Sequence, residues 1–248
     1  DWSSDVCSSD PVEGNSLREY LQQPSLPLPF ALDIVAQILE ALEEFERWHL
    51  THGNLKPENI LITQEQRVKL TDHAMGIQIK RHAQDETIKN ADAHYLSPDQ
   101  ILEKKLDIRS DLYNLGVVFY EMIARTPPYT GHYPFIILQH HITAPVPSVR
   151  SQFPDIPAEV EAWISKLLAK SPEGRFESPS VLKEQILEFQ SLQMERTRPK
   201  SPEESPMDGL AETNGSLLDV AFEDAFQHIE NVKEKGLSPL PLEGETKG

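Results

Sequence analysis

The feature that most constrains the fold is an apolar run from Asp111 to Ala124, with the sequence DLYNLGVVFYEMIA. Wound as a helix, this run is apolar on nearly every side, and such a helix has to be buried. It is shorter than the roughly 20 residues that span a bilayer. It therefore predicts a helix in the middle of a globular domain, with other elements packed around it.

Further helices are predicted on either side of this run. Apolar residues three and four positions apart indicate amphipathic helices over 30–49 and 158–170. Ser178 followed by Pro179 is typical of a helix start and predicts a last helix that runs to about Leu192.

A short hairpin is predicted between the first two helices. The apolar strands 60–62 and 67–71 flank the polar residues TQEQ, which is the pattern of strand, turn and strand. The polar stretch 77–94 follows, and we interpret it as a long loop, which is usually functional or mobile at that length. The predicted fold class is therefore α+β, mainly α.

The composition excludes some partners. The chain carries 23 basic and 40 acidic residues, for a net charge of −17, which argues against a nucleic-acid surface or an anionic membrane surface. The sequence shows no membrane-spanning stretch and no signal peptide. Cys7, the single cysteine, allows no internal disulfide, which fits a reducing compartment. We therefore expect a cytoplasmic protein.

Both ends of the chain differ from its middle. Residues 1–10, DWSSDVCSSD, show no periodicity and resemble translated sequencing-adapter read-through, so we interpret them as a non-native artefact. Residues 193–248 are rich in proline, serine and acidic residues, and we expect an acidic tail without a core. Within that tail, apolar residues predict a short amphipathic helix at 216–235.

The predicted hairpin places chemistry-bearing residues together. Its strands are antiparallel, so Asn59 at its entry and Asp72 at its exit should lie side by side. An amide oxygen and a carboxylate oxygen in one place suit a hard cation such as Mg²⁺. Lys56, three residues before Asn59, could reach a phosphate on the same metal.

A set of strings resembles the bacterial-type, eukaryotic-like serine/threonine protein kinase family. The string HGNLKPEN (52–59) resembles the H-R-D-L-K-P-E-N of the kinase catalytic loop. Four further strings follow in the family's order: TDHA (71–74) in place of D-F-G, YLSPDQ (95–100), RSDLYNLG (109–116) and PEGRF (172–176). The resemblance covers about residues 11–190.

The resemblance implies a protein-kinase-like fold and a site for Mg–ATP. Residues 11–192 would form the C-terminal lobe, and we expect this chain to be a truncated piece that lacks the N-terminal lobe. Asn59 and Asp72 would hold the metal, and Lys56 would contact a phosphate. The resemblance also implies that proteins are the substrates or partners, and that membrane tethering comes from a region beyond this chain.

Four residues receive structural roles from the same resemblance. Asp111 would anchor the catalytic-loop backbone, His52 belongs to the loop motif, and Asp99 and Arg175 would form a buried ion pair.

Several positions depart from the family pattern. Asn54 stands where the catalytic aspartate should be, and a neutral amide is not a general base; losing such a base costs about 10²–10⁴ in rate. Gly53 replaces the arginine that would read a phosphorylated loop, and His73 replaces the phenylalanine of D-F-G. Asp92 stands near the position of a threonine that contacts the catalytic lysine, so we expect it to pair with Lys56.

Three functions remain open from the sequence. The first is a pseudokinase that binds Mg–ATP and acts by regulation through its activation segment and acidic tail. The second is an active kinase in which water, Asp92 or Asp85 replaces the missing base. The third is a docking module that binds no nucleotide.

Two other features have less specific readings. The adjacent His140 and His141 are expected at the surface on a helix rather than as metal ligands. The apolar stretch Tyr133–Leu138 fits either a protein-binding surface or core packing.

Overall fold

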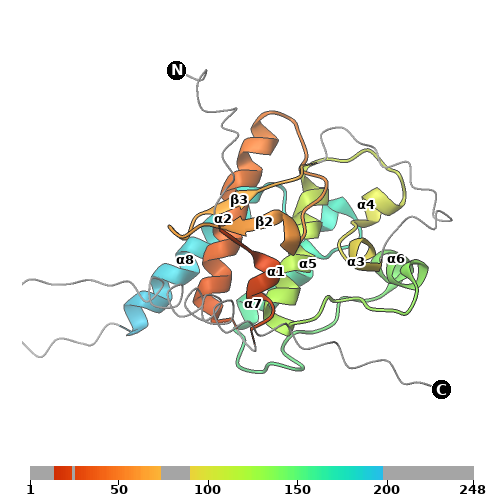
Figure 1. The fold of residues 1–248 in the computed structure, drawn as a ribbon. Coiled ribbons are helices and arrows are strands. Elements are labelled where there is room, and N and C mark those ends of the chain that lie inside the picture. Colours follow the sequence, from red (N-terminus) through yellow and green to blue (C-terminus); the bar gives the residue numbers. More distant parts are fainter. Residues whose placement is uncertain (1–13, 24–25, 74–89, 198–248) are drawn as a thin grey trace, which may run out of the picture.

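The helix α5 (Ile108–Ala124) lies at the centre of the computed structural model, which describes residues 14–23, 26–73 and 90–197. Figure 1 shows α2 (Leu28–Arg47) beside it, with α8 (Pro179–Thr197) packed along the outer side of α2. The helix α7 (Ala158–Leu167) packs against α5. These helices provide the surroundings that the apolar run requires.

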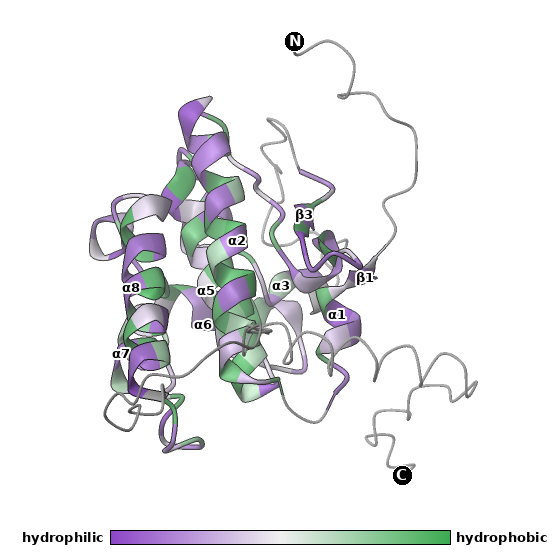
Figure 2. Ribbon diagram, turned by 90° about the vertical axis from the view of Figure 1, so that its left-hand side faces the viewer, coloured by the Kyte–Doolittle hydropathy of each residue, from purple (hydrophilic) through white to green (hydrophobic). Residues whose placement is uncertain are grey.

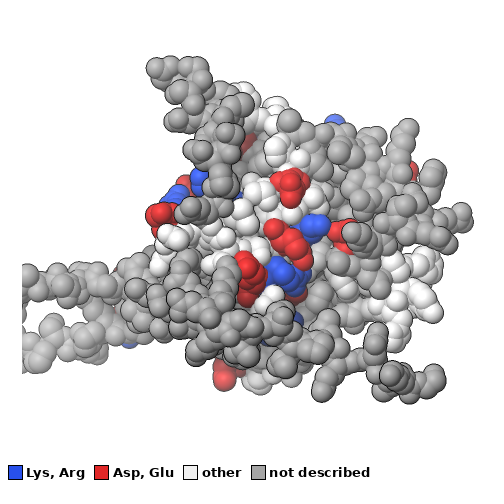
Figure 3. Space-filling view, in the orientation of Figure 1, with Lys and Arg blue, Asp and Glu red and all other residues white. Residues whose placement is uncertain are grey.

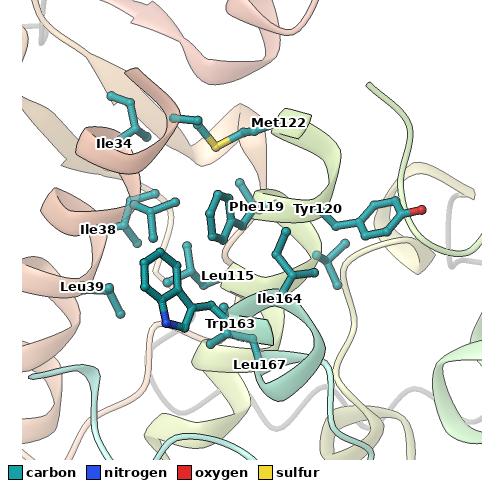
Figure 4. Close-up of a cluster of buried hydrophobic side chains, with 14 of the residues drawn as sticks. Ile34, Ile38, Leu39, Leu115, Phe119, Tyr120, Met122, Trp163, Ile164 and Leu167 are labelled. Carbon is teal, nitrogen blue, oxygen red and sulfur yellow. The ribbon is translucent and has the colours of Figure 1, made fainter. Parts of the chain in front are cut away.

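The predicted central burial is confirmed. Every residue of α5 except Arg109 is buried. Figure 4 shows how the core is built, with side chains of α2, α5 and α7 meeting around Phe119. In Figure 2 the green, hydrophobic surfaces of the helices face one another and the purple residues lie outside. Burial of this apolar surface, at roughly 25 cal/mol per Å², is the main stabilising contribution to the lobe.

The flanking helices occur close to where the periodicity places them. The helix α2 begins and ends two residues earlier than the predicted 30–49, and α7 ends three residues earlier than the predicted 170. The helix α8 begins at Pro179, as predicted, and continues beyond Leu192 to Thr197. Its extension is consistent with the good helix formers in QMER and with Pro199, the next residue that cannot continue a helix.

The hairpin is also confirmed, and a third strand joins it. The strands β2 (Ile60–Ile62) and β3 (Val68–Leu70) are antiparallel, with Ile60 opposite Leu70. The strand β1 (Asn15–Ser16) pairs antiparallel with β2, in the order β1-β2-β3. Two residues are too few to produce an alternating pattern, so β1 was not predicted.

Short elements complete the lobe. They are α1 (Leu17–Tyr20), η1 (Pro57–Asn59), α3 (Asn90–Ala93), α4 (Pro98–Ile101), α6 (Pro134–Thr143) and η2 (Pro172–Gly174). The expected loop 77–94 thus ends in a helical turn, and most of it lies outside the described residues, as do residues 1–10 and the predicted helix at 216–235. Within the described ranges, no helix has the length and apolar character that a bilayer span requires.

The helix α6 divides the apolar stretch at its start between surface and core. Tyr133 and Phe135 are 68% and 61% exposed, whereas Ile137 and Leu138 are buried. Core packing therefore explains Ile137 and Leu138, and the reading as a protein-binding surface stays a prediction for Tyr133 and Phe135.

The expected surface position of His141 is wrong. His141 is fully buried, and its Nδ1 lies 2.9 Å from the hydroxyl oxygen of Tyr113 on α5. Its ring also packs edge-on against Tyr129, with centroids 4.9 Å apart. Adjacent helical residues point to different sides, and here one of the two sides is the core.

This burial predicts a pH dependence of stability. Burial, together with the positive charge of Lys170, lowers the pKa of His141 to about 3. The unfolded chain takes up this proton near pH 6.5, whereas the folded chain does so only near pH 3, so stability falls as the pH decreases between these values. The slope is about 1.4 kcal/mol per pH unit for one proton.

The variant His141→Asn should lose that dependence, because an amide can replace Nδ1 but does not titrate. Between pH 7 and pH 5 the unmodified protein should lose about 2 kcal/mol more unfolding free energy than the variant. Urea denaturation at the two pH values measures this difference, and the contributions of other groups cancel in it. An equal loss in both proteins would contradict the assignment.

Candidate functional site

The loop between α2 and β2 is anchored from within the core. The buried carboxylate of Asp111 accepts hydrogen bonds from the backbone N–H groups of His52 and Gly53, each at 2.7 Å. Burial raises the pKa of Asp111 to about 7, while these two hydrogen bonds act in the opposite direction. Gly53 has a φ of 70°, a left-handed conformation in which a side chain would be strained. The anchoring role expected for Asp111 is thus present in the geometry.

His52 is a structural part of this loop. It is fully buried, and its Nδ1 accepts a hydrogen bond from the backbone N–H of Asn54 at 3.3 Å. Burial lowers the pKa of His52 to about 4, so the ring is neutral at physiological pH. Its ring lies 5.5 Å from Phe45 and 6.5 Å from His73 between centroids. His73, although exposed, therefore lies edge-on to the rings of Phe45 and His52.

The hairpin brings the expected metal ligands to one end of the sheet. The backbone carbonyl of Asn59 accepts a hydrogen bond from Thr71 N–H at 2.9 Å, which extends the β2–β3 pairing by one step. Asn59 is therefore opposite Thr71, and Asp72 is the next residue. Asp72 has an exposed side chain and a φ of 55°, a left-handed conformation uncommon outside glycine. Amide and carboxylate oxygens placed in this way fit a hard cation.

Asn54 is held within the same site. The side-chain Nδ2 of Asn54 donates to the backbone carbonyl of Asp72 at 3.2 Å. The backbone carbonyl of Asn54 accepts a hydrogen bond from Asn59 Nδ2 at 2.9 Å. The side-chain amide at the base position thus bonds Asp72, and the backbone of the same residue bonds Asn59. The side-chain amide offers a hydrogen-bond donor where a general base would need an acceptor for a proton.

Lys56 pairs with Asp92, as the sequence led us to expect. The Lys56 Nζ lies 2.7 Å from Asp92 Oδ1, and the two side chains are 22% and 29% exposed. Asp85, the other acidic candidate for a replacement base, lies outside the described residues.

The predicted pair of Asp99 and Arg175 is also present. The Arg175 Nη1 donates to Asp99 Oδ2 at 2.6 Å, with side-chain exposures of 0% and 3%. Arg175 further donates to the backbone carbonyls of Ala169, Arg109 and Lys170, so its charge is surrounded by acceptors. This pair joins α4 to the loop before α8.

A second charged cluster was missed by the sequence reasoning. We call Arg18, Glu58, Tyr95 and Glu121 the Arg18 network. Arg18 donates to Glu58 at 2.8 Å, to Glu121 at 2.7 Å and to the Tyr95 hydroxyl at 2.5 Å. Figure 3 shows basic and acidic side chains side by side in the middle of the face that carries α1 and β2.

The Arg18 network had a signal in the sequence. Glu121 is an acidic residue within an apolar run, and a buried carboxylate needs a partner. What the sequence could not supply is the partner's identity, because Arg18 lies 103 positions away.

The sequence model of the protein kinase domain family matches residues 6–187 of this chain. A probable serine/threonine-protein kinase of Streptomyces coelicolor is 34% identical over 181 residues, which is 71% of this chain and 27% of that protein. The serine/threonine-protein kinase PknB of Mycobacterium tuberculosis strain H37Rv is 31% identical over 183 residues, which is 71% of this chain and 29% of that protein.

A solved structure shares the fold. The kinase domain of Mycobacterium tuberculosis PknI, crystallised as a double mutant, aligns with a TM-score of 0.55 at 23% identity, over 72% of this chain and 63% of that one. The chain spans under a third of the length of the two kinase relatives. The anchored loop, the hairpin and the family match agree, and the chain belongs to the protein kinase domain family, with bacterial serine/threonine kinases among its relatives.

Proposed function

We propose that this protein is a pseudokinase, which binds Mg–ATP and acts on its protein partners by regulation rather than by phosphoryl transfer. The observation that carries the proposal is the state of Asn54, whose amide donates to the Asp72 carbonyl. A neutral amide held in this way accepts no proton from a substrate hydroxyl. The direct test is an assay of phosphoryl transfer and of Mg–ATP binding by the complete protein, in which turnover at ordinary kinase rates would overturn the proposal.

The residues present fit a bound Mg–ATP from the side of this lobe. Asn59 and Asp72 would hold the metal, which supplies charge neutralisation to the phosphates when bound. Lys56 is half-buried on the same loop and would orient a phosphate once it is released from Asp92. The domain that we propose for this role is residues 11–192, with residues 193–248 as an appended tail.

An active kinase is the second candidate, and one observation favours it. The carboxylate of Asp92 and the amide of Asn54 line one cavity, so an acidic group is close to the base position. Phosphoryl transfer depends mainly on positioning and electrostatics, so a displaced carboxylate can serve. Phosphotransfer that is abolished by Asp92→Asn but unaffected by Asn54→Ala would select this candidate. A complete protein that binds no Mg–ATP would instead select the docking module.

Release of Lys56 should strengthen nucleotide binding. The variant Asp92→Thr removes a carboxylate that competes with phosphate for Lys56, so the affinity of the complete protein for Mg–ATP should rise by about fivefold to tenfold. Isothermal titration calorimetry measures this change. Asp155→Thr is the matched control, because it removes one exposed negative charge outside the site and should leave the affinity unchanged.

A second variant distinguishes the loss of the Lys56–Asp92 ion pair from a general change in the charge of the site. Adding Lys56→Ala to the Asp92→Thr variant should cancel the gain. An unchanged affinity in Asp92→Thr would contradict the competition between Asp92 and phosphate.

A further inference from the structure

The side chain of Gln100 makes more contacts than its helix requires. Gln100 is the third residue of α4, which begins directly after Ser97. Its Oε1 accepts a hydrogen bond from the backbone N–H of Ser97 at 2.9 Å, and its own backbone N–H donates to the Ser97 hydroxyl at 3.2 Å. These two bonds form a capping box, in which glutamate serves as well as glutamine. The cap therefore accounts for the Oε1 of Gln100 and leaves its Nε2 unexplained.

The Nε2 group of Gln100 reaches the loop that carries Asn54. It donates to the backbone carbonyl of Gly53 at 2.8 Å, across 47 positions of sequence. Gln100 is half-buried, and its Oε1 accepts a second hydrogen bond from Asn114 Nδ2 on the central helix at 3.1 Å. Because Oε1 is held by two donors, the direction in which Nε2 points is fixed.

Gly53 is the residue of this loop that most needs an external restraint. It has a φ of 70°, and glycine adopts positive and negative φ about equally well, so the peptide unit that follows it has little intrinsic preference for one orientation. Both ends of that unit are held by side chains. Gln100 binds the Gly53 carbonyl at 2.8 Å, and His52 Nδ1 accepts the N–H of Asn54 at 3.3 Å. The second bond is the longer one, so Gln100 provides the stronger restraint.

We propose that Gln100 is a positioning residue, which holds the Gly53–Asn54 peptide unit and thereby sets the direction of the side chain at the base position. Asp111 holds the preceding peptide unit through the N–H of Gly53. Gln100 completes the restraint of this glycine from α4, so the side chain of Asn54 follows the placement of that helix. The inference deepens the proposed function, because it names the group that orients the residue on which that function depends.

The peptide unit can be observed selectively in the complete protein. Labelling glycine with carbon-13 at the carbonyl and asparagine with nitrogen-15 gives NMR correlations only from Gly–Asn pairs. This chain contains two of them, Gly53–Asn54 and Gly14–Asn15. The correlation that is lost in Asn54→Ala belongs to the first pair, and the correlation of the second pair serves as a reference.

Two variants remove the Nε2 donor in different ways. Gln100→Glu keeps the capping box, but its ionised carboxylate cannot donate to the Gly53 carbonyl. Gln100→Met removes the whole amide without adding charge. Both variants should move the carbon-13 shift of the Gly53 carbonyl and the nitrogen-15 shift of Asn54, and both should leave the reference correlation in place.

Ser97→Ala is the matched control. It removes the hydroxyl of the same capping box and leaves the bond from Gln100 Nε2 to Gly53 intact, so the correlation should stay where it is. An unmoved correlation in the two Gln100 variants, or an equal displacement in Ser97→Ala, would overturn the proposal.

A kinetic measurement separates positioning from folding. In the Asn54→Asp background, adding Gln100→Met should lower kcat by about tenfold to hundredfold and change the Kd for Mg–ATP by less than about twofold. Adding Ser97→Ala instead should change neither value, and an unchanged kcat with Gln100→Met would contradict the positioning role. This measurement rests on the proposed function, because it needs the gain from Asn54→Asp. A missing gain would count against the missing base, whereas the NMR correlation decides the role of Gln100 by itself.

Discussion

Phosphoryl transfer by an Asn54→Asp variant of the complete protein is expected to exceed that of the unmodified protein by about 10²–10⁴. The substitution preserves side-chain shape and replaces a donor with a carboxylate. That carboxylate cannot keep the contact that Asn54 makes with the Asp72 carbonyl, because both atoms would be acceptors. It is therefore free to turn toward a substrate hydroxyl and accept its proton.

A radiolabel transfer assay on a generic protein substrate measures this gain. Asn54→Ala is the matched control, because it removes the amide without adding a base, and it should leave the low rate unchanged. Turnover by the unmodified protein at about 1–100 s⁻¹, the usual range for kinases, would refute the pseudokinase proposal. A gain in Asn54→Asp that equals the gain in Asn54→Ala would show that the amide obstructs the site and that no base is missing.

Asp99→Ala is expected to destabilise the lobe by about 3–5 kcal/mol, because it leaves the fully buried charge of Arg175 without its counter-ion. Typical domains have a total stability of about 5–15 kcal/mol, so this loss is at least about a fifth of it. Urea denaturation followed by circular dichroism measures the change.

The control is an ion pair between an arginine and a carboxylate that are both exposed to solvent. Arg47 and Glu44 are 2.9 Å apart but 67% and 56% exposed, so Arg47→Ala should change stability by about 0.5 kcal/mol at most. A loss in Asp99→Ala as small as that of the control would mean that the three backbone carbonyls around Arg175 suffice to hold its charge.

The elements that the sequence predicted are those that form over a continuous stretch. The run around Leu115 is apolar on all sides and became the central helix, because burial is the only stable environment for such a surface. The same reasoning located the hairpin and so placed Asn59 beside Asp72. The ion pair of Lys56 with Asp92 was predictable because Lys56 lies in a family string and Asp92 stands near the position of a threonine that contacts that lysine in the family.

What the sequence did not predict depends on contacts between distant segments. A strand as short as β1 is determined by its pairing with β2 and not by its own residues. His141 looked like a surface residue because its hydroxyl partner, Tyr113, is 28 positions away. Asn114 and Glu121 did carry a signal, since a polar residue in a buried run needs partners, but periodicity does not identify them.

The Arg18 network has an evolutionary consequence. Its four members come from α1, η1, the segment before α4 and the central helix, and Glu121 is only 5% exposed in its pair with Arg18. Changing Arg18 alone leaves the buried carboxylate of Glu121 without its counter-ion, and changing Glu121 alone leaves the Tyr95 hydroxyl without its acceptor and Arg18 with Glu58 as its remaining carboxylate. Substitutions at these positions are therefore strongly epistatic. We expect them to covary across related sequences, so that each lineage keeps the whole set or exchanges it for another in which the buried groups again have partners.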